Sequence, residues 1–177
     1  FRDYQLQNAW VWEHQALTRA RYCAGDAGVG SQFEAIRVEI LRQKRDLATL
    51  RDEVLAMRQR MLEQHASRSD EYFDIKHDRG GLVDVEFIVQ YLVLGHSHQH
   101  PELCGNLGNI ALLGIAADLG LIVRQLAGPV RDAYRHYRHQ QHVLRLNANR
   151  RAQVERHGEK QRIEAVGALW QAVFGTH

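Results

Sequence analysis

The chain has 177 residues, of which 45% are hydrophobic and 25% are charged, and its formal net charge is +2. This composition is typical of a globular domain with a proper core, and so small a net charge excludes the strong electrostatic field of a nucleic-acid-binding or membrane-binding protein. No signal peptide and no apolar run of about 18–20 residues occurs, and the two distant cysteines, Cys23 and Cys104, indicate free thiols, so we expect a cytoplasmic protein.

Helix-forming residues dominate the chain, and only two prolines interrupt it. This pattern predicts an all-α fold, a helical bundle of about five to seven helices in a single domain over residues 1–177. The first helix is expected over Leu6–Cys23, where apolar residues recur with the helical period. Gly25, Gly28 and Gly30 are expected to end this helix and to separate it from the next.

The first helix carries two tryptophans and a carboxylate at close spacing. Trp10 and Trp12 are expected to be core or interface anchors, because each indole can bury a large area. Glu13 falls in the middle of the apolar side, so its carboxylate needs a partner if that side is buried. Arg19 lies at the edge of the same side and is followed by Arg21.

Two more helices are predicted before the centre of the chain. Ser31 is the expected N-cap of the second helix, with Glu34 three residues later as in a capping box. A long third helix follows over Leu47–His65, where apolar residues recur at spacings of three and four. The charged residues that mostly lie off this apolar stripe favour a solvated face over a partner surface; they are Arg51, Arg58, Arg60 and Glu63.

The most apolar run in the chain follows a glycine pair, Gly80-Gly81, with Lys76 and Arg79 just before it. Gly81–Leu94 alternates like a strand, but its length favours a helix, and a helix apolar on most sides is a buried, central one. Two interpretations of the glycine pair stay open. It can form an anion site at the start of a helix, or a tight turn that leads into a buried helix.

Helices are also predicted in the C-terminal part of the chain. Three alternate histidines precede Pro101, but no carboxylate or thiol is spaced to complete a site with them, so we expect no metal there. The next helix is expected over Asn106–Leu121. A last long helix either begins near Pro129 or bends at it. Residues 148–158 are expected to form a loop before a short C-terminal helix anchored by Trp170.

Two segments of the sequence resemble a known family. One is Lys76-x-Asp78-x-Gly80-Gly81-x-x-Asp84-x-Glu86-Phe87-Ile88-x-Gln90-Tyr91-Leu92-Val93-Leu94, and it resembles the helical-domain signature of bacterial glutamine synthetase adenylyltransferase. The other is Asn8-Ala9-Trp10-x-Trp12-Glu13-His14-Gln15-Ala16-Leu17-x-Arg19-Ala20-Arg21. It is similar to the segment that follows the catalytic domain in the C-terminal half of that enzyme. The resemblance covers most of the chain and weakens after about Asn147.

The resemblance implies a function for the whole enzyme. The chain is then a helical domain excised from a larger nucleotidyltransferase, which uses ATP and Mg²⁺ to transfer AMP to a tyrosine of glutamine synthetase and so regulates nitrogen assimilation. The implied partners are the upstream catalytic domain, glutamine synthetase and the PII signal protein, with no nucleic acid and no membrane. Candidates for the interface with the catalytic domain are Trp10, Trp12, Glu13, Arg19 and Arg21. Candidates for phosphate binding or for facing the catalytic domain are Lys76, Asp78, Gly80, Gly81, Asp84, Glu86 and Gln90.

No catalytic residue and no metal site is expected in the chain itself. In the superfamily that the resemblance implies, an Asp-x-Asp pair on a strand holds the metal ion. Asp84 and Glu86 are two apart on a predicted helix, so their side chains point about 200° from each other and are badly placed to hold one ion together. The catalytic pair is therefore expected upstream, and the isolated chain is predicted to be inactive. The alternative is a non-catalytic interaction module that binds PII or glutamine synthetase.

Overall fold

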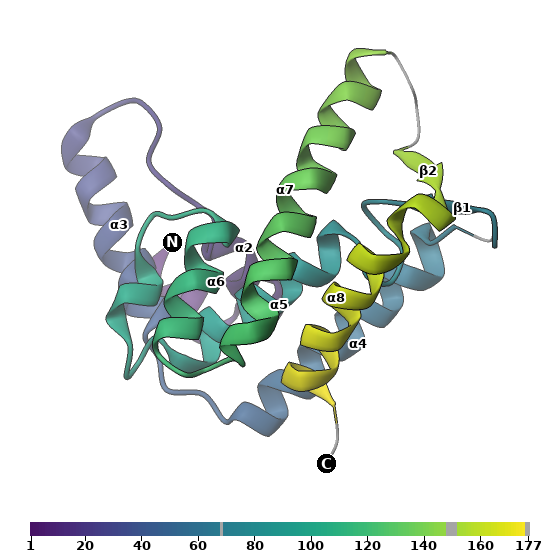
Figure 1. Cartoon of the computed structure of the whole chain (residues 1–177). Coiled ribbons are helices and arrows are strands. Elements are labelled where there is room, and N and C mark those ends of the chain that lie inside the picture. Colours follow the sequence, from purple (N-terminus) through teal and green to yellow (C-terminus); the bar gives the residue numbers. More distant parts are fainter. Residues whose placement is uncertain (68, 148–151, 176–177) are drawn as a thin grey trace.

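The structure, a computed structural model, describes residues 1–67, 69–147 and 152–175, and in these ranges most residues are helical (Figure 1). The predicted all-α class is confirmed. The α-helices are α1 Arg2–Gln7, α2 Val11–Leu17, α3 Ala27–Leu41, α4 Leu47–His65, α5 Leu82–His96, α6 Asn109–Asp118, α7 Arg124–Leu146 and α8 Arg156–Phe174. A 3₁₀ turn, η1, spans Pro101–Cys104, and the two short strands are β1 Tyr72–Asp74 and β2 Gln153–Glu155.

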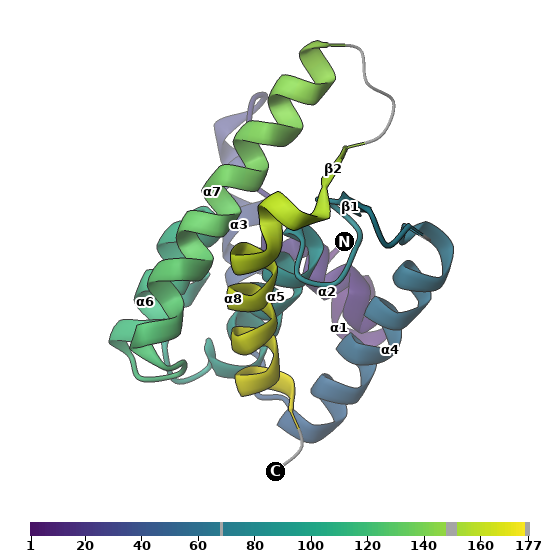
Figure 2. The ribbon, with the colours of Figure 1, turned by 45° about the vertical axis from the view of Figure 1, so that its right-hand side comes forward.

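Helix α5 is the centre of the bundle, as its sequence predicts. It packs against α2, α4, α6, α7 and α8, and both views show these helices around it (Figures 1 and 2). Its apolar residues are buried on every side, including Val85, Ile88, Leu92 and Leu94. A helix that buries all of its faces gains hydrophobic stabilisation from each neighbour, so α5 fixes where the other helices lie.

The single helix expected over Leu6–Cys23 is wrong, because this segment forms two short helices, α1 and α2. The break falls at Asn8–Trp10. The Glu13 carboxylate accepts a hydrogen bond from the Trp10 N–H at 2.9 Å, which satisfies a backbone donor at the start of α2. Without a Gly or Pro at the break, the helical spacing of apolar residues conceals it. The segment between α2 and α3 contains Gly25, whose φ is 114°.

Helix α3 begins earlier than the sequence analysis expects. Its N-cap is Asp26, whose side chain accepts from the Val29 N–H at 2.9 Å, so the expected Ser31 cap is wrong. Gly28 and Gly30 lie inside the helix and do not break it. Gly30 has a packing role, because a Cβ there would lie 2.6 Å from the Tyr22 ring. The aspartate cap and this close aromatic contact outweigh the low helix propensity of the glycines.

Four later predictions can be compared with the structure directly. Helix α4 has the predicted bounds of Leu47–His65, whereas α6 is shorter than expected, at Asn109–Asp118. Helix α7 begins at Arg124 and contains Pro129, so of the two alternatives the start near Pro129 is wrong, and the helix runs through the proline. Helix α8 begins at Arg156 and is longer than the expected C-terminal helix. In both views α7 extends past the other helices (Figures 1 and 2).

The expected loop over residues 148–158 is partly wrong. Residues 148–151 lie outside the described residues, but Gln153–Glu155 form β2, and α8 follows at once. Strand β2 pairs antiparallel with β1, and Phe73 lies opposite Val154. Pairing between segments so distant in the sequence leaves no local pattern, so the sequence does not reveal it. Within the described ranges, none of the helices has both the length and the apolar character to cross a membrane.

Candidate functional site

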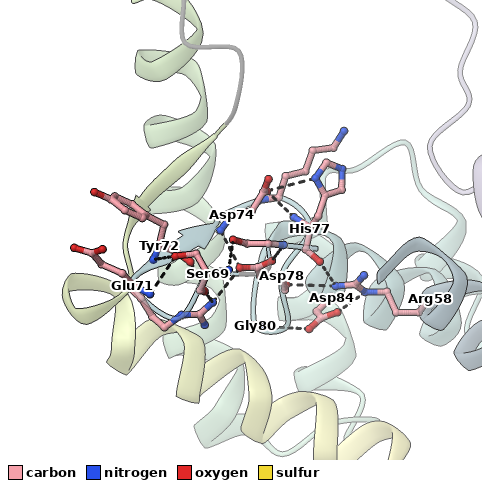
Figure 3. Close-up of polar contacts among 12 residues, drawn as sticks. Arg58, Ser69, Glu71, Tyr72, Asp74, His77, Asp78, Gly80 and Asp84 are labelled. Atoms are coloured by element: carbon pink, nitrogen blue, oxygen red, sulfur yellow. Dashed lines mark hydrogen bonds and ion pairs between the residues drawn. The ribbon is translucent and has the colours of Figure 1, made fainter. Parts of the chain in front are cut away.

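The loop before α5 is folded by its own carboxylates (Figure 3). The Asp74 carboxylate accepts hydrogen bonds from the backbone N–H groups of Lys76 and His77, each at 2.9 Å. The Asp78 carboxylate accepts from the N–H of Asp74 at 3.0 Å and from the N–H of Ser67 at 2.6 Å. Charge-assisted hydrogen bonds of this kind hold a loop in one conformation. We call the segment from Asp74 to Gly81 the signature loop.

The glycine pair of the signature loop fits where no side chain would. Gly80 has a φ of 86°, and a Cβ there would lie 2.8 Å from Cγ2 of Ile163 on α8. A Cβ on Gly81 would lie 2.8 Å from the carbonyl oxygen of Ile75. The first glycine is therefore required by backbone conformation and by close packing, and the second by the close approach of two backbone segments.

The backbone donors at the start of α5 are already paired within the chain. The Gly80 N–H donates to the Asp84 carboxylate at 2.6 Å, and the Gly81 N–H donates to the Asp78 carbonyl at 3.0 Å. The Leu82 N–H donates to the Ile75 carbonyl at 2.8 Å. Asp84 thus supplies negative charge where an external anion would bind a helix N-terminus. This geometry favours the tight-turn interpretation of the glycine pair.

A buried arginine from α4 neutralises Asp84. The Arg58 Nε donates to Oδ1 of Asp84, and its Nη2 donates to the carbonyl of His77 at 2.8 Å (Figure 3). The expectation that Arg58 belongs to a solvated charged face is wrong. Arg58 follows Val54 by four residues and shares its buried side of α4. That spacing is the sequence signal that could have placed the side chain in the core.

A second arginine connects the signature loop to the C-terminal helix. Arg156, the first residue of α8, contacts the Asp78 carboxylate at 3.1 Å. Its guanidinium also lies 5.5 Å from the centre of the Phe73 ring, within cation–π range. Arg156 falls in the predicted loop over residues 148–158, so its role does not follow from the sequence pattern. Asp78 is therefore engaged by two backbone segments and by α8.

Helix α2 contacts the polar side of α5, so the two segments that carry the family resemblance lie against each other. Gln15 donates to Gln90 at 2.9 Å, and Arg19 forms an ion pair with Glu86 at 2.7 Å. The Tyr134 hydroxyl of α7 donates to the same Glu86 oxygen at 3.2 Å. Burial, with the nearby Glu86 carboxylate as a second cause, raises the pKa of Tyr134.

The two tryptophans lie on the outside of the protein. Trp10 is 70% exposed and Trp12 is 51% exposed, so neither is a core residue. Glu13, which follows Trp12, is partly buried, and it accepts hydrogen bonds from the Trp10 N–H and from the Tyr4 hydroxyl. A pocket of about 360 Å³ lies beside the tryptophans; it is lined by Trp10, Val11, Trp12, Glu53, Ala56, Met57 and Arg60. Arg21 is exposed in the segment that follows α2.

Asp84 and Glu86 serve different neighbours, as their helical spacing predicts. Asp84 pairs with Arg58 in the core, and Glu86 pairs with Arg19 at the surface. In the ranges that the structure describes, no group of three or more His, Cys, Asp or Glu side chains is arranged to hold a metal ion.

Lys76 contributes its backbone to the signature loop, since its N–H donates to Asp74 and its carbonyl accepts from Val83 at 3.1 Å.

Two protein-family models match the chain. The model described as GlnD PII-uridylyltransferase matches residues 48–164, which include the signature loop and α5. The model described as glutamate-ammonia ligase adenylyltransferase matches residues 1–36, which include the motif over residues 8–21 with Trp10 and Trp12, called the tryptophan segment below.

Curated relatives match nearly the whole chain. The chain is 59% identical over 176 residues to the bifunctional glutamine synthetase adenylyltransferase/adenylyl-removing enzyme of Aromatoleum aromaticum. The matched segment covers 99% of this chain and 19% of the relative. It is 59% identical to the enzyme of the same name from Chromobacterium violaceum, covering 88% of this chain and 17% of the relative. It is 52% identical to that of Burkholderia mallei, covering 99% of this chain and 20% of the relative. The chain therefore spans about a fifth of the length of these relatives.

Proposed function

Because the chain belongs to the family of the GlnD PII-uridylyltransferase model and its curated relatives are glutamine synthetase adenylyltransferases, we propose that it is a helical domain of a longer nucleotidyltransferase. In this proposal the domain follows the catalytic domain in the C-terminal half of that enzyme. Its task is to hold the catalytic domain through the tryptophan segment. The match of residues 1–36 to an adenylyltransferase model supports this assignment.

The exposure of Trp10 and Trp12 is the observation that carries the proposal. Exposed aromatic side chains in a contiguous apolar patch are typical of interaction surfaces, and tryptophan is among the residues that dominate binding energy there. The adjoining pocket on α4 offers an apolar concavity with charged Glu53 and Arg60 at its edge. An interface with a neighbouring domain accounts for side chains that a separate globular domain has no reason to expose.

The chemistry of the parent enzyme is part of the same proposal. The names of the relatives support transfer of an adenylyl group, with glutamine synthetase as the acceptor protein. ATP and Mg²⁺ then bind in the catalytic domain, because the present sequence contains no Asp-x-Asp pair. The isolated chain is accordingly proposed to be inactive, and the parent enzyme to work in the cytoplasm. PII is proposed as a regulatory partner of the parent enzyme.

The signature residues take two roles within this proposal. Asp78, Gly80, Gly81 and Asp84 shape the turn into α5 and keep its direction fixed. Glu86 and Gln90 hold the tryptophan segment against α5 through Arg19 and Gln15. Through both roles these residues support the catalytic domain indirectly, because they fix the position of the surface that the catalytic domain is proposed to contact. Direct phosphate binding by the signature loop fits the geometry less well, because its backbone donors are already paired.

Hydroxyl-radical footprinting tests the proposed interface directly. The oxidation rates of Trp10 and Trp12 are compared between this chain alone and the full-length parent enzyme. We expect several-fold slower oxidation of both tryptophans in the parent enzyme, with Tyr72 on β1, also an exposed aromatic residue, as the internal control. Equal rates for the tryptophans in both proteins would exclude an interface at this position.

A kinetic measurement complements the footprint. Trp12→Ala in the full-length enzyme should lower the rate of adenylylation, because the catalytic domain loses an anchor. The same substitution in the isolated chain should change its free energy of unfolding by less than about 1 kcal/mol, since the side chain is largely exposed. A large loss of stability in the isolated chain would assign Trp12 to folding instead.

A further inference from the structure

Glu86 lies at a junction of four helices. Its Oε1 atom accepts a hydrogen bond from Arg19, which lies just after α2, at 2.7 Å. The same atom accepts from the Tyr134 hydroxyl of α7 at 3.2 Å. The Tyr134 hydroxyl in turn accepts from the Asn109 side chain of α6 at 2.9 Å, and that contact is buried. The Glu86 carboxylate on α5 is thus held by Tyr134 of α7, which is itself held by Asn109 of α6. Such a chain of hydrogen bonds fixes the direction in which the carboxylate presents its oxygen to Arg19.

Arg19 faces solvent on the same side as the tryptophan segment. Trp12, Ala16 and Arg19 are exposed while Gln15, Leu17 and Thr18 are buried, and spacings of four and three place the exposed residues on one face of the helical turn. The Arg19 N–H continues that turn by donating to the Ala16 carbonyl at 3.1 Å. The surface proposed for the catalytic domain therefore carries a cation beside its aromatic anchor.

The guanidinium of Arg19 is held at one nitrogen only, as far as the described residues extend. Nη1 donates to Glu86, and the side chain stays 46% exposed against 23% for Glu86. The guanidinium has five N–H donors in a rigid fork, which suits the oxygens of a phosphate group.

An ordinary surface ion pair would not require this arrangement. Exposed pairs contribute about 0–1 kcal/mol, and they seldom need a tyrosine and an asparagine from two more helices behind them. Here the supporting groups restrict the carboxylate, and the carboxylate restricts the arginine, whose guanidinium makes no other hydrogen bond within the described residues. Pre-organisation of a charged group in this way is what electrostatic stabilisation of a charged ligand requires.

We propose that Glu86 is a positioning residue that holds Arg19 so that its free N–H groups bind the phosphates of a nucleoside triphosphate in the neighbouring catalytic domain. This inference rests on the proposed function, since it needs that domain beside the tryptophan segment. It assigns the ligand contact to Arg19 and a supporting role to Glu86, Tyr134 and Asn109. It also gives the polar face of α5 a role in nucleotide binding that the signature loop does not need to perform.

Steady-state kinetics of the full-length parent enzyme tests the inference, with ATP as the varied substrate. A charge-assisted hydrogen bond is worth about 1.5–3 kcal/mol, so Arg19→Ala should raise the KM for ATP by about tenfold to a hundredfold. Arg19→Lys should recover part of this loss. Glu86→Gln should give a smaller increase, and the double variant Arg19→Ala/Glu86→Gln should be no worse than Arg19→Ala alone, because Glu86 acts through Arg19.

A control variant and the footprint of the tryptophans make the outcomes of the kinetic test decisive. Arg124→Ala removes another exposed arginine, paired with Asp118 at 2.7 Å on the opposite end of the α6–α7 connection, and should leave the KM for ATP unchanged. An Arg19→Ala variant with unchanged KM for ATP would overturn the inference. If the footprint of Trp10 and Trp12 is still protected in that variant, the proposed domain interface survives; if it was never protected, the proposed function fails as well.

Discussion

Arg58 and Asp84 form an ion pair that is sealed from solvent, with 2.6 Å between Nε and Oδ1 and side chains that are 0% and 2% exposed. The pair joins the middle of α4 to the first turn of α5. Two charges in the interior are stable together only if each satisfies the other and their remaining polar atoms find partners. Asp84 meets that condition by also accepting from the Gly80 N–H. Arg58 meets it in part, because its Nη2 donates to two carbonyls of the signature loop while its buried Nη1 has no hydrogen-bond partner in the part of the chain that the structure describes.

Breaking this pair should destabilise the domain strongly. Arg58→Met leaves the Asp84 carboxylate buried with the Gly80 N–H as donor and the half-exposed Arg79 guanidinium 4.0 Å away. Removal of one partner from a buried pair costs about 3–5 kcal/mol. Urea unfolding of the isolated chain measures the change in the free energy of unfolding. Arg124→Ala is the matched control, since its exposed pair with Asp118 should contribute less than about 1 kcal/mol. Equal effects of the two substitutions would contradict the assigned role.

Gly80→Ala should also destabilise the chain, by more than about 1 kcal/mol. The added Cβ needs a left-handed backbone conformation and would lie 2.8 Å from Ile163, with the backbone of Ile163 at 3.0 Å. Gly128→Ala is the control, because a Cβ at that position inside α7 has nothing within 4 Å. Alanine has the higher helix propensity, so Gly128→Ala should raise stability by up to about 1 kcal/mol. Thermal unfolding of both variants should therefore shift in opposite directions.

The stability of the domain should fall as the pH drops from 7 to about 5.5. Burial lowers the pKa of His14 below 6.5, and the same cause lowers the pKa values of His77 and His96. His14 shows the reason, because its Nδ1 faces an Arg45 donor at 3.3 Å and its Nε2 lies 3.0 Å from the Gln5 carbonyl. The neutral ring fits both partners, whereas a second proton would face the Arg45 guanidinium.

The sign follows from proton binding. Below pH 6.5 the unfolded chain takes up protons that the folded chain refuses, so protonation favours unfolding until the pH reaches the lower folded-state pKa values. Melting temperatures at several pH values check this, and His14→Gln should reduce the drop. The carboxyl groups with shifted pKa values, Glu34, Glu39 and Asp46, are shifted downward from 4.5 or 3.8 and titrate below this window. A stability that rises between pH 7 and 5.5 would refute the prediction.

The isolated chain should not bind ATP and Mg²⁺ with a Kd below about 100 μM, roughly 5.5 kcal/mol of binding free energy. The backbone donors of Gly80 and Leu82 already have internal acceptors, and Asp84 places a carboxylate at the start of α5. Calorimetric titration measures this directly. Tight binding that disappears in Lys76→Ala would instead make the signature loop a phosphate site, and would reverse our interpretation of the glycine pair.

The helical period of apolar residues was sufficient to predict the elements in which that period is strong. The apolar run after Gly81 and the stripe over Leu47–His65 predict α5 and α4, because hydrophobic periodicity decides both. The break between α1 and α2 was missed, since it depends on how Glu13 bonds the Trp10 backbone and not on a helix-breaking residue. The β1–β2 pair was missed because its partners are far apart in the sequence.

The sequence was sufficient to predict which carboxylates and glycines belong to the candidate site, but not what each side chain contacts. The sequence motifs include Asp78, Asp84 and Glu86, yet only the fold shows that two of these carboxylates bind arginines from other helices inside the domain. Arg58 was assigned to a solvated face although its spacing from Val54 is a sign of burial, and Arg156 was assigned to a loop; the carboxylates that pair with them are known only from the fold. Trp10 and Trp12 were expected as core or interface anchors, and their exposure removes the first alternative.

The pairing of β1 with β2 also constrains how the chain folds. It closes a ring of about 80 residues, for which the loop-closure entropy alone is about 4 kcal/mol. Three residues per strand supply too few contacts to offset that cost by themselves. The ring should therefore close only after α5, α6 and α7 have packed, with α8 docking last through Arg156 and the contact of Ile163 with Gly80. A chain shortened before Gln153 should keep its central helices while its signature loop loses order.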